Sequence, residues 1–333
     1  MKSLQLTLAT GAFGIFATMA ASQDITLKAS HNANADEPYQ IGLERMAEVL
    51  MEKTDGKATI KAFPNAQLGD GLDNVQGVQL GTIDIAVIAN GVLANSVPDM
   101  TLFSLPFLFE DAEHMRAALT DPEVLEYVNE LAQEQGFRVL GLFTAGTRHI
   151  MTTEKPLHSM ADLEGLKIRT QQSPAQVDAF REFGANPTPI AYGELYGSLE
   201  TGVVDGAEAA NTNYLSKNFY EVAPNWAQVG WLQLVSPVIM GEQRFRRLPD
   251  DVQKALLETV KEALPYQHEA YAESDKKAFG VLKEKDVNIT ELDPVPFRKA
   301  AKAVYEKYID NERKEKLFDL VQKVAGDDGD TKK

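Results

Sequence analysis

Strand-like and helix-like segments alternate in the first part of the chain, and this alternation restricts the fold more than any other feature of the sequence. Residues 25–30, 57–63 and 83–88 are predicted to form strands, and residues 37–53 form a helix between the first two. Polar and apolar residues alternate in 57–63, whereas the helix gathers its apolar residues on one face. A helix between two strands joins them as parallel neighbours. The chain is therefore expected to adopt an α/β fold.

Polar side chains stand at the ends of several predicted strands. Further strands are predicted at 137–143, 166–170 and 203–208, and an extended segment at 185–192 ends in an aromatic residue. In open α/β sheets, ligands bind at the carboxyl ends of the strands. The residues at these ends form the candidate substrate-binding set: His31, Asn32, Asn90, Arg148, Arg169, Tyr192, Glu208 and Asn211.

Two arginines in this set indicate the chemistry of the ligand. Arg148 follows the strand 137–143, and Arg169 closes the run 166–168. A guanidinium group offers a planar fork that donates two parallel hydrogen bonds to a carboxylate. The asparagines and the glutamate suit hydroxyl groups, and Tyr192 offers an apolar ring face. The set predicts a site for a hydroxylated carboxylate, although local sequence alone equally allows both arginines to form structural salt bridges.

The charge balance excludes several classes of partner. The chain has 333 residues and a formal net charge of −16. An acidic surface repels phosphate backbones and anionic lipids, so we expect no binding to nucleic acid or to a membrane surface. An anionic ligand needs locally placed arginines to overcome this field, which strengthens the interpretation of Arg148 and Arg169.

The N-terminus has the pattern of a secretory signal peptide. Lys2 precedes a largely apolar segment, and a run of small residues follows around Ala20–Ser22. We expect residues 1–23 to be removed, with an uncleaved membrane anchor as the alternative. Cysteine is absent, which excludes disulfides, thiol catalysis and attachment through a lipidated cysteine. The sequence predicts a soluble protein exported to the periplasm.

The sequence lacks the patterns of common catalytic sites. None of its five histidines has a metal-binding spacing, and no nucleophile elbow, phosphate loop or dinucleotide fingerprint occurs. We expect a binding protein that requires no cofactor and no metal. The alternative is an exported enzyme that acts on a sugar acid and depends on His149 or Glu208.

Short motifs in a characteristic order carry a family resemblance. Together they resemble the solute-binding proteins of tripartite ATP-independent periplasmic (TRAP) transporters, of the C4-dicarboxylate-binding, DctP-type family. The resemblance covers essentially all of the chain after the predicted signal peptide. The motifs are Gln67-Leu68-Gly69-Asp70, Gly81-Thr82-Ile83-Asp84, Leu105-Pro106-Phe107, Gly146-Thr147-Arg148, the segment 162–169 (DLEGLKIR), the segment 184–189 (GANPTP) and Val204-Asp205-Gly206-Ala207-Glu208.

The resemblance implies a two-domain periplasmic solute-binding fold that closes on its ligand. Each domain is a β-sheet flanked by helices, and a long helix spans both domains. The helical pattern from residue 249 to about 284 supplies that helix, although Pro265 is expected to kink or break it. The expected division is a signal peptide at 1–23, domain I at 24–146 plus about 234–273, domain II at 147–233 plus about 274–310, and a C-terminal helix with a disordered tail at 311–333.

The resemblance also implies roles for individual residues. Arg169 occupies the position of the arginine that makes the principal bidentate contact with the substrate carboxylate. Arg148 matches a second, more variable ligand arginine. His31 lies where the first-strand loop contributes a polar contact, and Tyr192 lies where an aromatic ring packs on the ligand.

Departures from the family pattern narrow the ligand. Sialic-acid-type members carry an asparagine where this chain has Ala209, and Asn211 is the candidate replacement. Gly71 and Ala89 stand where such members have acidic groups. We therefore favour a smaller sugar acid, a uronate or an aldonate, with C4-dicarboxylates and 2-oxo acids as alternatives. The implied partners are this small carboxylate and the membrane subunits of a TRAP permease, and we expect the protein to be a monomer.

Overall fold

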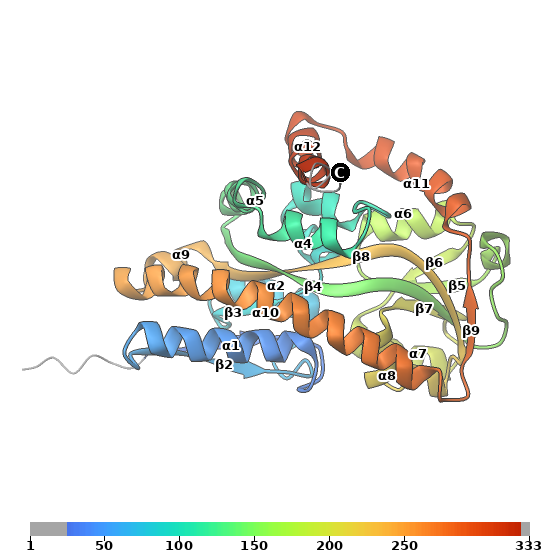
Figure 1. Cartoon of the computed structure of the whole chain (residues 1–333), viewed down its shortest axis with the longest axis horizontal. Helices are drawn as coiled ribbons and strands as arrows, with labels where there is room; N and C mark the ends of the chain where they lie inside the picture. Colours follow the sequence, from blue (N-terminus) through green and yellow to red (C-terminus); the bar gives the residue numbers. More distant parts are fainter. Residues whose placement is uncertain (1–24, 328–333) are drawn as a thin grey trace, which may run out of the picture.

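One mixed sheet of nine strands organises the described part of the chain. The computed structural model describes residues 25–327, so the predicted signal peptide and residues 328–333 lie outside the described residues (Figure 1). The strand order is β2-β1-β3-β8-β4-β7-β5-β6, with β9 beside β8. The strands are β1 (Ile25–Ser30), β2 (Ala58–Phe63), β3 (Ile85–Val87), β4 (Phe137–Thr152), β5 (Lys167–Thr170), β6 (Asn186–Pro189), β7 (Gly206–Ala209), β8 (Asn225–Gly241) and β9 (Asn288–Glu291).

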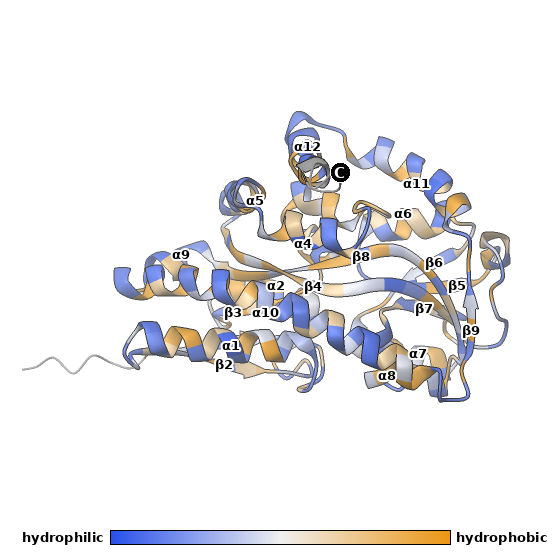
Figure 2. Ribbon diagram, in the orientation of Figure 1, coloured by the Kyte–Doolittle hydropathy of each residue, from blue (hydrophilic) through white to orange (hydrophobic). Residues whose placement is uncertain are grey.

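Helices cover the sheet and connect its strands. The α-helices are α1 (Pro38–Lys53), α2 (Gly71–Leu80), α3 (Asn90–Leu93), α4 (Ala112–Thr120), α5 (Pro122–Glu134), α6 (Pro174–Glu182), α7 (Leu195–Glu200), α8 (Asn211–Ser216), α9 (Glu242–Arg246), α10 (Asp250–Leu282), α11 (Pro294–Tyr308) and α12 (Glu312–Asp327). The 3₁₀ helices are η1 (Pro98–Ser104), η2 (Met160–Leu163), η3 (Tyr192–Glu194) and η4 (Phe219–Glu221). The outward faces of the long helices are hydrophilic and their inward faces are hydrophobic (Figure 2).

The predicted α/β class is confirmed, and the pairing is parallel at both ends of the sheet. β1 pairs in parallel with β2 and β3, and β5 pairs in parallel with β6 and β7. We call the β1–β3 end the first lobe and the β5–β7 end the second lobe. The antiparallel pair of β4 and β8 runs the length of the sheet and belongs to both lobes (Figure 1). The predicted domain boundaries themselves stay a prediction.

A bulge interrupts the β4–β8 pair between the lobes. Thr144 lies opposite Val235, but Thr147 lies opposite Gln233, so β4 carries one extra residue here. Gly146 within this bulge has φ +76°, and the ring of Tyr271 lies 2.4 Å from the place where a Cβ atom would stand. Only glycine combines this backbone conformation with that close approach. β4 continues through this bulge, so it is much longer than the strand predicted at 137–143.

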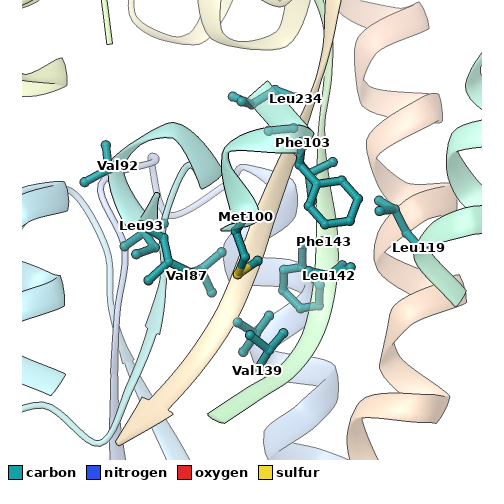
Figure 3. Close-up of a cluster of buried hydrophobic side chains, with 14 of the residues drawn as sticks. Val87, Val92, Leu93, Met100, Phe103, Leu119, Val139, Leu142, Phe143 and Leu234 are labelled. Carbon is teal, nitrogen blue, oxygen red and sulfur yellow. The ribbon is translucent and has the colours of Figure 1, made fainter. Parts of the chain in front are cut away.

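The first lobe is held by a large apolar cluster where the sheet meets its connecting helices. Side chains from β3, η1, α4, β4 and β8 converge there, among them Val87, Phe103, Leu119, Phe143 and Leu234 (Figure 3). All five are at most 3% exposed. Burying a side chain of this size contributes about 1.5–3 kcal/mol relative to leaving it in water. This packing fixes the carboxyl end of β3 and the first half of β4.

The long helix α10 crosses the molecule and contacts both lobes. It packs against α1, α4 and α8 (Figure 1). The expected break at Pro265 is wrong, because the helix runs for 33 residues without interruption. Pro265 and Lys261 are both exposed, so the carbonyl that loses its hydrogen bond can face water. Among residues 25–327, no helix combines the length and the apolarity needed to cross a membrane.

Three segments have no counterpart among the elements predicted from sequence. Residues 211–216 form the helix α8, and residues 288–291 form the strand β9. The segment 102–109 is largely buried, and its first residues form the end of η1. The predicted C-terminal helix is confirmed, although α12 continues to Asp327 and so includes the first residues of the expected tail.

Candidate functional site

A pocket lies between the two lobes, at the carboxyl ends of the strands as predicted. The residues just after β1 and β3 form one wall, and those after β5 and β6 form the other. The empty space is about 590 Å³, open solvent at the mouth included. Its lining residues are Asn32, Ala33, Tyr39, Asp70, Gly71, Ala89 and Val92 from the first lobe, Ala145, Arg148 and Leu234 from the β4–β8 pair, and Arg169, Gln171, Gln172, Ile190, Ala191, Tyr192 and Asn213 from the second lobe.

Three neighbouring strands of the second lobe build a buried ionic group. β7 lies between β4 and β5, so its residue Glu208 reaches arginines on both neighbours. The Nε atom of Arg148 donates to Oε2 of Glu208 at 2.6 Å, and Nη1 of Arg169 donates to Oε1 at 3.1 Å. All three side chains are at most 3% exposed. The two predicted ligand arginines therefore share one carboxylate.

The remaining donors of the two arginines are used differently. Arg148 also donates through Nη1 to Oδ1 of Asn213 at 3.0 Å and through Nη2 to the carbonyl of Glu208 at 3.3 Å. Arg169 donates through Nε to the carbonyl of Ile190 at 3.0 Å. Within residues 25–327, no hydrogen bond is found for Nη2 of Arg169. All three guanidinium nitrogens of Arg148 donate to the protein, whereas Nη2 of Arg169 is free to donate in the pocket wall.

The pKa values of the two guanidinium groups also shift in opposite directions. Burial lowers the pKa of Arg148, but the adjacent Glu208 outweighs burial, so this pKa lies above the ordinary arginine value. For Arg169, burial and the nearby charge of Arg148 outweigh Glu208 and lower the pKa. One carboxylate does not fully compensate two buried cations. The positive charge on Arg169 would be stabilised by an anion in the pocket.

The first-lobe wall carries an acidic residue, Asp70, that the candidate set does not contain. Asp70 caps the N-terminus of α2, and its Oδ1 atom accepts a hydrogen bond from Asn32 at 2.6 Å. Its Oδ2 atom accepts one from the backbone N–H of Gly193 in the second lobe at 2.8 Å. Asp70 thus contributes a negative charge to the pocket and a contact across it.

Four of the eight predicted site residues line this pocket: Asn32, Arg148, Arg169 and Tyr192. The Tyr192 ring lies 5.9 Å from the Arg169 guanidinium carbon, and no partner for its buried hydroxyl is found within the described chain. Glu208 is fully buried behind the wall, as the counter-ion of both arginines. Arg148 lies inside β4 and not after a strand end, because the strand continues past the bulge.

The structure places the other three predicted residues away from the pocket. The His31 ring is buried, with Nε2 at 2.9 Å from Oε1 of Gln40. Asn90 donates to the Met100 carbonyl and to Ser104, so its amide holds η1. Asn211 donates to Asp275 at 2.8 Å and accepts from the Trp226 indole at 2.9 Å. Asn211 therefore does not occupy the position expected of a replacement for the missing asparagine at Ala209.

Five polar lining residues were missed: Tyr39, Asp70, Gln171, Gln172 and Asn213. Gln171 directly follows β5 and fits the strand-end rule that selected Arg169, so the rule could have found it. Asn213 lies on α8, which was interpreted as a loop, and its spacing from Glu208 gave no signal. Burial raises the pKa of Tyr39 to about 12, so its hydroxyl stays protonated and is able to donate a hydrogen bond.

The predicted absence of a metal site stays a prediction. In the part of the chain that the structure describes, no group of three or more histidine, aspartate or glutamate side chains is arranged to hold a metal ion. His149, a residue on which the enzymatic alternative depends, accepts hydrogen bonds at Nδ1 from the backbone N–H groups of Val229 and Gly230. Its other neighbour is Trp226, whose ring packs edge-on against it.

Comparison with known proteins agrees with this site. A family model described as bacterial extracellular solute-binding protein, family 7, matches residues 29–311. The chain belongs to this family. The resemblance to solute-binding proteins of TRAP transporters is thereby confirmed.

Two relatives are solute-binding proteins, and one of them is named for its ligand. The chain is 31% identical to the 2,3-diketo-L-gulonate-binding periplasmic protein YiaO of Escherichia coli, over 90% of this chain and 91% of that one. It is 30% identical to the solute-binding protein RD1_1052 of Roseobacter denitrificans, over 89% and 91%.

Solved structures of family 7 proteins match the fold closely. A TRAP periplasmic solute-binding protein from Sulfitobacter sp. NAS-14.1 with bound β-D-galacturonate matches with a TM-score of 0.84 and 29% identity, over 90% of this chain and 99% of that one. One from Anaerococcus prevotii with bound D-glucuronate matches with a TM-score of 0.87 and 28% identity, over 91% and 99%. These likenesses confirm the predicted fold class.

Proposed function

We propose that this family 7 protein captures a sugar acid, a uronate or an aldonate, in the periplasm and delivers it to the membrane permease of a TRAP transporter. One observation carries the proposal: Arg148 and Arg169 are buried in the pocket wall and share a single carboxylate. The free donor of Arg169 then takes the ligand carboxylate, and Arg148 supports it from the neighbouring strand. The uronates bound by similar proteins support the same class of ligand.

The opposite wall favours hydroxyl groups over a second carboxylate. Asp70 and Asn32 form a hydrogen-bonded pair there, and Tyr39 adds a neutral hydroxyl. Carboxylate and amide oxygens accept hydrogen bonds from sugar hydroxyls, whereas Asp70 repels a second negative charge. A C4-dicarboxylate would place that charge near this wall. The pocket therefore favours a polyhydroxylated monocarboxylate over the dicarboxylate alternative.

The enzymatic alternative receives no support from the site. Glu208 is held between two arginines, which suits a permanent counter-ion better than a general base that must take up a proton. His149 is buried and uses Nδ1 to accept backbone hydrogen bonds. Purified protein incubated with its ligand should return the ligand chemically unchanged in a mass spectrum.

A thermal-shift screen tests the proposal directly. The panel should include glucuronate, galacturonate, gluconate, malate, succinate and pyruvate. We expect a rise in melting temperature with at least one sugar acid, because a ligand at about 100 times its Kd stabilises the folded state by about 2.7 kcal/mol. Calorimetry on the positive acids then gives the affinities. Shifts confined to malate and succinate, or to pyruvate, would overturn the proposed ligand class.

A further inference from the structure

Glu37 is a buried carboxylate outside the pocket lining whose partners come largely from the other lobe. It stands at the N-cap position of α1, yet its side chain does not cap the helix. Its Oε1 atom accepts hydrogen bonds from the Asn34 backbone at 3.0 Å and from the Ser216 hydroxyl at 2.9 Å. Its Oε2 atom accepts one from Nδ2 of Asn213 at 2.6 Å. Asn213 and Ser216 belong to α8 of the second lobe.

Further contacts join the same two segments. The side chain of Asn34 donates to the carbonyl of Ser216 at 3.0 Å, and Lys217 donates to the side-chain oxygen of Asn34. We call the group Asn34, Glu37, Asn213, Ser216 and Lys217 the α1–α8 latch. Its partners are 176 to 183 residues apart in sequence, so only the approach of the two lobes brings them together.

One member of the latch also contacts a ligand arginine. Asn213 donates to Glu37 through its amide nitrogen and accepts from Nη1 of Arg148 through its amide oxygen. The two partners fix the orientation of the amide, because Glu37 offers only acceptors and Arg148 only donors. A continuous chain of hydrogen bonds thus runs from the pocket wall through α8 to the first lobe.

Opposing energies act on the buried carboxylate of Glu37 in the latch. Burial raises the pKa of Glu37, which shows the cost of removing its charge from water, while the hydrogen bonds and the charge of Lys217 oppose that cost. A buried charge of this kind gains stability only when all its partners are in place. Arg148, itself held by Glu208, keeps Asn213 in the orientation that Glu37 requires.

We propose that Glu37 is a positioning residue that couples ligand capture in the pocket to closure of the two lobes through Asn213, which lines the pocket. The inference rests on the proposed function, since it takes a sugar acid as the ligand that fills the pocket beside Asn213. Without touching the ligand, Glu37 stabilises the arrangement in which the lobes meet, and it slows release of the bound acid.

The experiment compares the wild type with Glu37→Gln and, as a matched control, Glu52→Gln. Glu52 is an exposed glutamate on the same helix. Glutamine keeps the shape of Glu37 but loses its charge and one acceptor atom. Because the variant weakens hydrogen bonds to a charged group, we expect the dissociation rate of galacturonate or glucuronate to rise on the order of tenfold or more. The association rate and the melting temperature without ligand should stay near wild-type values, which a general folding defect would not allow.

Distance measurements between the lobes give an independent result. Because the chain has no cysteine, Leu80→Cys and Val203→Cys on exposed positions of the two lobes can be spin-labelled specifically. Saturating sugar acid should narrow the distance distribution of the wild type, while Glu37→Gln keeps a population with the unliganded distances. Ser216→Ala should keep a smaller population with the unliganded distances. The effects of Ser216→Ala and Glu37→Gln should be less than additive in the double variant.

Failure of the latch and failure of the proposed function give different results. An unchanged dissociation rate and an unchanged distance distribution in Glu37→Gln overturn the latch. Absence of binding of every sugar acid by the wild type overturns the proposed ligand. In that case the unliganded distributions decide the latch: a shift to longer distances in Glu37→Gln supports it, and identical distributions overturn it.

Discussion

The two walls of the pocket are built from different kinds of structural element. In the second-lobe wall the charged side chains stand on adjacent strands, where Arg148, Arg169 and Glu208 form a buried ionic group. The first-lobe wall consists of loop residues that follow β1, β3 and β2, with the partly exposed Asn32, the capping Asp70 and the small Ala89. Strands hold a charge rigidly, whereas loops change easily without disturbing the core. We infer that the second lobe supplies affinity for the carboxylate and the first lobe supplies selectivity for the rest of the ligand.

The largest expected effect is on the second-lobe wall. Arg169→Ala should weaken binding of the sugar acid by about 2–5 kcal/mol, or roughly 30-fold to several-thousand-fold, because the ligand carboxylate loses its partner. Arg169→Lys should also bind poorly, since an ammonium group cannot reproduce the fork. Calorimetry measures the affinity of both variants, and Arg45→Ala, at a partly exposed position, is the control. An affinity of Arg169→Ala within about threefold of wild type would show that the second lobe does not anchor the ligand.

The counter-ion of the second-lobe wall should affect stability more than selectivity. Glu208→Gln leaves two buried guanidinium groups without a carboxylate, so we expect the unliganded protein to lose about 3–5 kcal/mol of unfolding free energy. A bound sugar acid should recover part of this loss. Glu242 is the matched control, because it also bridges two arginines, Arg138 and Arg246, but far from the pocket. Denaturant unfolding with and without ligand would contradict this role if Glu208→Gln were as stable as wild type.

A smaller effect is expected on the first-lobe wall. Asp70→Asn removes a negative charge while asparagine still caps α2 well. We expect malate and succinate to bind about tenfold more tightly than they bind wild type, since their second carboxylate is no longer repelled. The control is Asp121→Asn, which changes another capping aspartate at the start of α5. If Asp70→Asn leaves the ratio of sugar-acid to dicarboxylate affinity unchanged, the first lobe does not set selectivity.

The smallest effect at neutral pH concerns His149, next to Arg148 on β4. Burial and the charge of Arg148 lower its pKa from 6.5 to about 3. Below pH 6.5 the unfolded chain binds a proton that the folded protein does not bind until about pH 3, so stability falls as the pH drops through this range. His31 and His268, whose pKa values burial also lowers, act in the same direction.

The variant His149→Asn isolates this contribution. An asparagine oxygen can accept the two backbone hydrogen bonds that Nδ1 now accepts, but it takes up no proton. We expect the dependence of unfolding free energy on pH to become shallower between pH 6.5 and about 4 by up to one proton. Unfolding curves at several pH values measure this slope, and a slope identical to that of wild type would contradict the assignment.

Local sequence patterns were sufficient to predict the scaffold, and half of the predicted site residues line the pocket. The period-2 and period-3.6 patterns located β1, α1 and β2, and the strand-end rule located the pocket, because both depend on neighbours in sequence. The rule misplaced His31 and Asn90, whose side chains point into the core at the same strand ends. Which way a residue after a strand turns depends on tertiary packing, and no local pattern encodes it.

By itself, the sequence determined the α/β class, the family and the two arginines of the pocket wall, since these follow from local periodicity, short motifs and residue chemistry. Only the tertiary structure decided how the arginines differ. β7 inserts between β4 and β5, so that Glu208 meets arginines 60 and 39 residues away. The same folding brings Asn213, and not Asn211, to the pocket and joins it to Glu37. Strand order and lobe contact are properties of the whole chain, which is why no single stretch of sequence revealed them.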